Sequence, residues 1–150
     1  MLMNVSQISG VCWQELILLA SQIPTKIPSL EMLIIFGSRA RGNTHVNSDW
    51  DFAILYNQQQ QIENRYLSLE VYGILSDVLR ISGEIDVINL SSCSPLIAHA
   101  VARDGKVLYE KTSGLFDSFQ SKALLSESQL RAIQKDLRKG LDVFLTKRGV

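Results

Sequence analysis

Cysteine and proline are both scarce in this 150-residue sequence, which holds two cysteines and three prolines. Neither cysteine belongs to a CxxC pair or has a histidine at metal-ligand spacing, which argues against a disulfide framework and a zinc site. We expect Cys12 and Cys93 to be reduced and buried, or nearly so. No apolar run approaches the roughly 18 residues of a membrane span, and the first residues lack the pattern of a signal peptide. We therefore expect a soluble cytoplasmic protein that makes no use of a membrane.

An excess of positive charge is lacking as well. Fifteen basic and fifteen acidic residues cancel to a formal net charge of zero. Such a chain has no net positive field to hold a long nucleic acid through its phosphates, which disfavours a polynucleotide partner. With 46% apolar residues, the length suits one globular domain with a core of its own.

Apolar periodicity predicts an α/β fold with a mixed β-sheet and flanking helices. Helical spacing or caps predict helices over residues 11–22, 58–82, 94–104 and 126–144. Apolar or alternating runs predict strands at residues 33–36, 51–56, 83–90 and 106–110. Two segments rich in turn formers or proline, 23–30 and 38–48, are predicted to be loops.

The last predicted helix carries an apolar stripe and a surplus of basic residues. Its stripe consists of Leu130, Ile133, Leu137, Leu141 and Phe144. We expect the stripe to pack on the core, as such stripes do in most globular proteins. The basic residues beside it suit a solvated face or, alternatively, an acidic partner.

Three acidic residues are the candidates for a metal site in this sequence. Asp49 and Asp51 stand two residues apart beside a predicted strand, so their side chains point to the same face if the strand begins at Asp49. Unpaired carboxylates at this spacing repel each other, and a hard cation such as magnesium relieves the repulsion. Asp86 lies in another predicted strand and can complete the site. Three acids on two strands can hold a pair of ions roughly 3.5–4 Å apart.

A polar turn precedes these acids and predicts a phosphate site. Gly37 ends a buried strand and permits a tight turn, which would present its amide, with the amide and hydroxyl of Ser38, to an anion. Arg39 and Arg41 add guanidinium groups that can contact phosphate oxygens. The sequence does not assign separate roles to the two arginines.

Each of these elements also has an ordinary explanation. Acid pairs occur on solvated strand ends, Gly-Ser pairs at plain turns and arginines on surfaces. The combination of all three in one short region favours the functional interpretation. We expect His45 to lie in solvent and His99 to be a surface or satisfied side chain. Trp50, between two acids, should point to the opposite face, into the core.

A strand, Gly-Ser, ten residues, Asp-x-Asp and a later Asp in a strand together resemble the nucleotidyltransferase superfamily that includes DNA polymerase beta. The segments GSRARG and SDWDFAIL are most similar to the minimal nucleotidyltransferases, which are often antitoxins of HEPN-domain ribonuclease toxins. The resemblance covers about residues 30–110. We predict a single nucleotidyltransferase domain over residues 1–150. The core motif does not explain the C-terminal helical tail over about 115–150, which departs from the resemblance.

The resemblance also implies a reaction and a site. Members of this group use ATP to place AMP on a tyrosine of the partner HEPN toxin, with two magnesium ions bound. The implied nucleotide-binding positions are Gly37, Ser38, Arg39 and Arg41. The implied metal-binding and catalytic positions are Asp49, Asp51 and Asp86, with Asp86 assisting the attacking hydroxyl.

Two other functions compete with this interpretation. A non-catalytic antitoxin would neutralise its toxin by covering it, although such a protein has no need for three convergent carboxylates. A nucleotidyltransferase acting on a small molecule is the second alternative, although similar antibiotic-modifying enzymes carry an additional helical domain. An RNA-tailing enzyme is weaker than both, because the net charge is zero.

Overall fold

The structure is a computed structural model that describes residues 7–8, 11–42, 49–57, 64–79 and 84–147. The strands are β1 (Gln7–Ile8), β2 (Val11–Cys12), β3 (Leu30–Phe36), β4 (Trp50–Tyr56), β5 (Ile85–Asn89) and β6 (Lys106–Glu110). The helices are α1 (Trp13–Ala20), α2 (Ile23–Lys26), α3 (Gly37–Arg41), α4 (Asn64–Leu79), α5 (Pro95–Asp104), α6 (Leu115–Ala123) and α7 (Glu127–Lys147). Along the described chain, no helix combines the length and the apolar character needed to span a membrane.

A mixed four-stranded sheet in the order β5-β4-β3-β6 forms the centre of the molecule. The central strand β3 runs antiparallel to β4 and β6, whereas β4 and β5 run parallel. Both central strands are buried along nearly their whole length, as their apolar sequences require, while β5 and β6 are half-exposed edges. This arrangement confirms the predicted mixed sheet with flanking helices.

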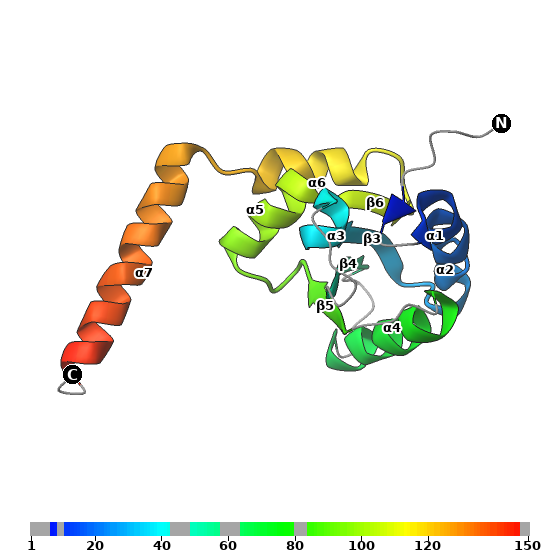
Figure 1. Cartoon of the computed structure of the whole chain (residues 1–150), viewed down its shortest axis with the longest axis horizontal. Helices are drawn as coiled ribbons and strands as arrows, with labels where there is room; N and C mark the ends of the chain where they lie inside the picture. Colours follow the sequence, from blue (N-terminus) through cyan, green and yellow to red (C-terminus); the bar gives the residue numbers. More distant parts are fainter. Residues whose placement is uncertain (1–6, 9–10, 43–48, 58–63, 80–83, 148–150) are drawn as a thin grey trace.

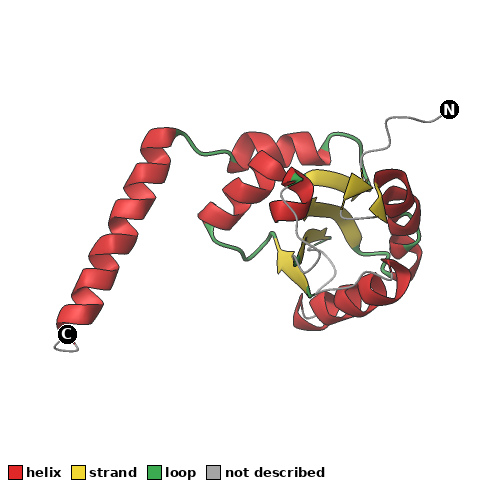
Figure 2. Ribbon diagram, viewed as in Figure 1, coloured by secondary structure: helices red, strands yellow, loops and turns green. Residues whose placement is uncertain are grey.

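Helices cover both faces of this sheet (Figures 1 and 2). On one face, residues of α1, α2 and α4 join a large apolar cluster that also contains Trp50 and Phe52. On the other face, residues of α5 and α6 pack against Met32, Ile34 and Ala53. Because alternate residues of a strand point to opposite faces, each central strand contributes to both clusters.

Three short segments differ from the sequence-based expectation. Residues 37–41 form helix α3 where a loop was expected, because Gly37 adopts a φ of 75° that turns the chain directly from β3 into a helix. Residues 23–26 form helix α2, with Pro24 in its first turn, a position that proline tolerates. Residues 11–12 belong to β2 and not to the first helix. Parts of the predicted loop at 38–48, helix at 58–82 and strand at 83–90 lie outside the described residues. These parts are residues 43–48, 58–63 and 80–83.

Side-chain caps begin the two helices that were predicted at residues 94–104 and 126–144. The Ser94 hydroxyl oxygen accepts a hydrogen bond from the Ile97 amide at 3.3 Å, with Pro95 in the first turn of α5. At the start of α7, the Ser126 amide donates to the Gln129 side chain at 2.8 Å, and the Gln129 amide donates to the Ser126 hydroxyl at 3.2 Å. This reciprocal pair is a capping box.

Helix α7 does not pack on the core, and the expectation that its stripe would do so is wrong. The helix leads away from the body of the molecule (Figures 1 and 2). Leu137 and Leu141, in the middle of the stripe, are 59% and 56% exposed. Periodicity predicts that one face of a helix is apolar, but not which surface covers it. The side chain of Phe144, in the same stripe, lies outside the described residues.

Candidate functional site

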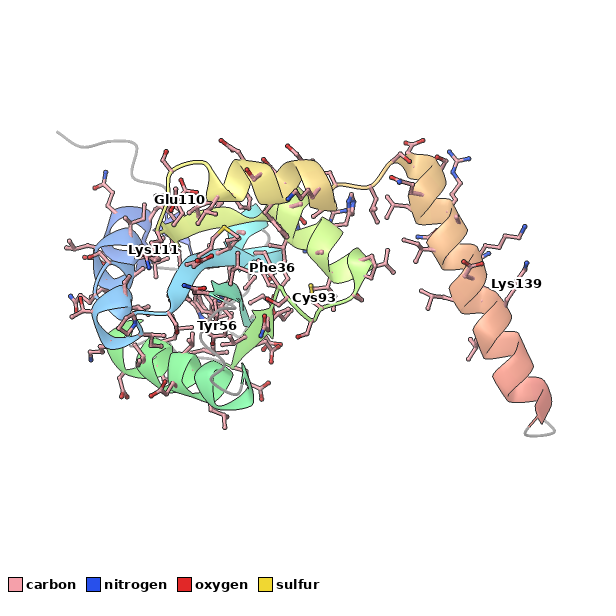
Figure 3. All side chains as sticks on the ribbon, turned by 180° about the vertical axis from the view of Figure 1, so that it is seen from behind. Phe36, Tyr56, Cys93, Glu110, Lys111 and Lys139 are labelled. Carbon is pink, nitrogen blue, oxygen red and sulfur yellow. The ribbon has the colours of Figure 1, made fainter. Side chains whose placement is uncertain are left out.

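Neighbouring strands bring Asp51 and Asp86 together. Asp51 is the second residue of β4, and in the parallel pairing with β5 its register partner is Asp86. On its other side, Asp51 pairs with Phe36, the last residue of β3, which is labelled in Figure 3. The two acids therefore stand side by side, next to the point where β3 ends.

Asp49 adds a third negative charge to this edge of the sheet. It precedes β4 and is exposed, whereas Asp51 is half-buried. Burial raises the pKa of Asp51, and the negative charges of Asp86 and Asp49 raise it further, against an opposing effect of Arg41. The negative charges of Asp49 and Asp86 thus both act on Asp51.

The donor set fits a hard divalent cation. Magnesium prefers carboxylate oxygens, and a cation beside Asp51 would relieve the repulsion that raises the pKa of this residue. Within the described ranges, no group of three or more His, Cys, Asp or Glu side chains is arranged to hold a metal ion. Asp49 and Asp86 are both exposed, so packing does not fix the direction of their carboxylates. Their assignment as metal ligands stays a prediction.

Gly37 makes room for the Asp51 carboxylate. A Cβ built on Gly37 would lie 3.1 Å from Cγ of Asp51 and would overlap its Oδ2. The φ of 75° at Gly37 is also in the left-handed region, which disfavours every residue with a Cβ. Glycine is therefore required here for two independent reasons. Ser38, the second residue of α3, lies half-buried beside this contact.

The two arginines of α3 have different surroundings. Arg39 is only 2% exposed, and its guanidinium carbon lies 4.1 Å from the ring centre of Trp50. Burial lowers the pKa of Arg39, and the charge of Asp49 opposes this effect. The predicted burial of Trp50 in the core is confirmed. Arg39 thus holds α3 against β4 through a cation–π contact, while its assignment to the nucleotide stays a prediction.

Arg41 forms an ion pair that the sequence did not reveal. Its Nη1 donates to Oδ2 of Asp104 at 3.2 Å, and Nη2 of Arg103 donates to the same oxygen at 2.8 Å. The neighbouring Arg103, and to a smaller extent Arg41, lower the pKa of Asp104. Asp104 lies 63 residues from Arg41, at the end of α5, where an acid reads as an ordinary surface residue. Only the packing of α5 beside α3 brings the two together.

The expectation for His99 is met, whereas Cys93 is free as expected but less buried than predicted. His99 is 8% exposed, and its Nδ1 accepts a hydrogen bond from the Leu125 amide at 3.0 Å, so it is a satisfied structural residue. Cys93 is a free, partly exposed thiol. His45 and the side chain of Cys12 lie outside the described residues.

The raised pKa of Asp51 predicts that Asp51→Asn stabilises the metal-free protein. Above its folded-state pKa, Asp51 is ionised in the folded and unfolded protein, and its charge lowers the free energy of unfolding. Below its ordinary pKa of 3.8 it is protonated in both states and has no such effect. Without divalent ions, the variant should therefore melt above the parent at pH 7, and the difference should shrink as the pH falls toward that value. Thermal unfolding from pH 4 to 8 measures this, with the exposed Asp117→Asn as control. Equal melting temperatures at pH 7 would contradict the prediction.

Known proteins match this chain in sequence along most of its length. A family model described as "Polymerase beta, Nucleotidyltransferase" matches residues 20–113. The protein adenylyltransferase MntA of Aphanizomenon flos-aquae (strain 2012/KM1/D3) is 48% identical over 141 residues, which cover 91% of this chain and 94% of the relative. A second protein adenylyltransferase MntA, from Shewanella oneidensis, is 31% identical over 83 residues, or 55% of this chain and 56% of the relative.

Solved structures match it as well. A chain in the crystal structure of a toxin–antitoxin with AMP-PNP has a TM-score of 0.61 and 26% identity, covering 89% of this chain and 98% of that chain. A chain in the complex of a tri-AMPylated Shewanella oneidensis HEPN toxin with an MNT antitoxin shares the fold, with a TM-score of 0.56 and 22% identity over 87% of this chain and 98% of that chain. The family match contains the turn at Gly37, all three acids and Asp104. The chain therefore belongs to the polymerase beta nucleotidyltransferase family and is a homologue of the MntA protein adenylyltransferases.

Proposed function

We propose that this chain is an antitoxin that transfers AMP from ATP to a hydroxyl, that of a tyrosine, on a cognate HEPN ribonuclease toxin and thereby neutralises it. The observation that carries the proposal is the pairing of Asp51 with Asp86 beside Gly37, in a chain 48% identical to a protein adenylyltransferase. A half-buried carboxylate with like charges around it costs folding free energy. A protein that only covered its toxin would gain nothing from that cost.

The reaction assigns a task to each part of the site. Asp49, Asp51 and Asp86 would hold two magnesium ions, which when bound stabilise negative charge on the phosphates. The turn at Gly37 and Ser38 would bind the triphosphate through backbone amides, with Arg41 contacting a phosphate oxygen from the side. These contacts would fix the α-phosphorus in line with the incoming hydroxyl.

The chemical step is a displacement at the α-phosphorus of ATP. The toxin hydroxyl oxygen forms a bond to this phosphorus, the bond to the bridging oxygen breaks, and pyrophosphate leaves. The hydroxyl proton passes to the carboxylate of Asp86, which comes from the neighbouring strand and is exposed. We place this reaction in the cytoplasm, where ATP is available.

The position of the transferred label tests the proposal. Incubated with the toxin, magnesium and ATP labelled at the α-phosphate, the parent protein should label the toxin, whereas ATP labelled at the γ-phosphate should leave it unlabelled. The reason is that adenylyl transfer keeps the α-phosphorus and releases the other two as pyrophosphate. Autoradiography of the separated chains measures this. Labelling from the γ-phosphate would show a kinase, and labelling from neither would remove the proposed activity.

Asp104 is expected to position Arg41 for ATP. Asp104→Ala removes the acceptor that holds the Arg41 guanidinium, so we expect the KM for ATP to rise about 5- to 10-fold, the loss of one oriented charge-assisted hydrogen bond, with kcat nearly unchanged. Asp104→Glu should recover part of the loss. Steady-state kinetics with varied ATP measures both constants, and Asp117→Ala controls for the removal of a surface charge. An unchanged KM in Asp104→Ala would contradict this role.

A further inference from the structure

Helix α7 presents an apolar face that the described residues leave largely uncovered, with Leu137 and Leu141 more than half exposed. The helix has 21 residues, so it is about 32 Å long. Four described apolar residues recur along one face at helical spacing, and we call them the α7 stripe: Leu130, Ile133, Leu137 and Leu141. Lys139, on another face of the helix, is labelled in Figure 3, where α7 is seen to extend from the body. An apolar stripe of this length in water marks an interaction surface.

The base of α7 is held in place by specific hydrogen bonds. The Leu125 amide donates to Nδ1 of His99 at 3.0 Å, and the Gln120 side chain donates to the carbonyl of Ala102 at 2.8 Å. Both bonds tie α6 and the linker before α7 to helix α5. The capping box of Ser126 and Gln129 then fixes where α7 begins. The helix is therefore an arm with an anchored origin.

An apolar pocket lies at this base. It has a volume of about 260 Å³ and is lined by Pro95, Ala98, Phe119, Lys122, Ala123 and Leu125. Leu124, directly beside it in sequence, is exposed. The pocket and the α7 stripe are joined by the linker that carries Leu124 and Leu125, so one elongated partner could cover both. Helix α5 connects them to the site, because its other end carries Asp104, about 14 Å from Pro95 along the helix axis.

We propose that the α7 stripe and the pocket at its base form the docking surface for the HEPN toxin, an inference that rests on the proposed function. A protein substrate must be held while its hydroxyl reaches the site, and Leu137 and Leu141 of the α7 stripe are both more than half exposed. The match to a chain of a toxin–antitoxin complex covers 89% of this protein, more than residues 1–126 can supply, so it includes part of α7. A part of the arm, at its start or further along, therefore has a counterpart in that chain.

The charged residues of α7 indicate which kind of toxin surface would complement the α7 stripe. Arg131 and Arg138 are seven residues apart at one edge of the stripe, where Arg131 is paired with Glu127 at 3.2 Å. Five basic against three acidic residues lie in α7 as a whole. The complementary surface is a helix or helix pair with an apolar ridge and acidic side chains along one edge. The stripe supplies the affinity and the charged edge fixes the orientation.

The test compares two double variants of the full chain with the same change in charge. Leu137→Glu with Leu141→Glu places charges in the stripe, whereas Ser128→Glu with Ala132→Glu places them on the opposite face, where both side chains are exposed. Binding to the purified toxin is measured by calorimetry, ATP binding by the same method, and oligomeric state by sedimentation. We expect the stripe variant to bind toxin at least 50-fold more weakly, with unchanged ATP affinity, and the control to bind as the parent does.

Equal toxin affinity in the stripe variant and the parent would overturn the docking surface. Conversion of a parent dimer to a monomer by the stripe variant, with toxin affinity unchanged, would overturn it too and show that a second copy of this chain covers the stripe. Failure of the proposed function gives a different result, in which the parent binds toxin through α7 but adds no AMP to it.

Discussion

Asp51→Asn should reduce AMP transfer to the toxin by about a hundredfold or more while leaving the fold intact. The substitution keeps the size of the side chain but removes the negative charge of a half-buried carboxylate, which the magnesium ions require as a ligand. A loss of about 3 kcal/mol in transition-state stabilisation corresponds to this change in rate. The measurement is the initial rate of label transfer from α-labelled ATP, with circular dichroism as the check on folding.

The matched control for this variant is Asp117→Asn. It makes the same substitution at an exposed acid on α6, outside the site, and should retain the parent rate. Transfer by Asp51→Asn within a few-fold of the parent would remove Asp51 from the site. Because the same variant should also melt at a higher temperature without metal, loss of activity through unfolding is readily recognised.

Gly37→Ala should have a second large effect, on both activity and stability. The new Cβ would overlap Oδ2 of Asp51 and lie 3.1 Å from its Cγ, so either the carboxylate or the turn must move. A displacement of about 1 Å at reacting groups costs about a hundredfold in rate. The positive φ adds roughly 1–2 kcal/mol of strain to the folded state. Transfer rate and thermal unfolding measure the two effects separately.

Gly42→Ala separates the strain from the displacement. Gly42 also has a positive φ, of 84°, but no heavy atom lies within 4 Å of a Cβ built on it. We therefore expect a similar loss of stability with activity close to that of the parent. If Gly37→Ala and Gly42→Ala lost the same fraction of activity, the contact between Gly37 and Asp51 would have no special role.

Local sequence patterns predicted the sheet because its strands satisfy a strong local rule. The central strands β3 and β4 contain the apolar runs 32–36 and 52–56, and burial on both faces follows directly from that pattern. The pairing of Asp51 with Asp86 was foreseen as two acids on neighbouring strands, since strand alternation and the resemblance pointed the same way. Helix α3 was missed because a five-residue helix after a glycine has the composition of a loop.

Contacts between distant segments could not be predicted from one sequence. The ion pair of Arg41 and Asp104 depends on how α5 packs beside α3, and no local pattern encodes that. The burial of Arg39 against Trp50 likewise depends on tertiary packing, because an arginine in a polar segment is usually exposed. For α7, the periodicity correctly predicted an amphipathic helix, but the covering surface is not part of this chain's own core. The division into a core over about 30–110 and a tail over about 115–150 stays a prediction.

The central claim is that this protein inactivates its toxin by catalysis and not by covering it. The most direct measurement incubates the toxin with one-twentieth as much of this protein, ATP and magnesium, removes this protein, and then determines the toxin's intact mass and ribonuclease activity. The account predicts that nearly all the toxin gains the mass of one or more AMP groups and stays inactive, because a covalent product does not follow mass action. Inactivation limited to one toxin per antitoxin, with no change in mass and with activity restored on separation, would contradict it.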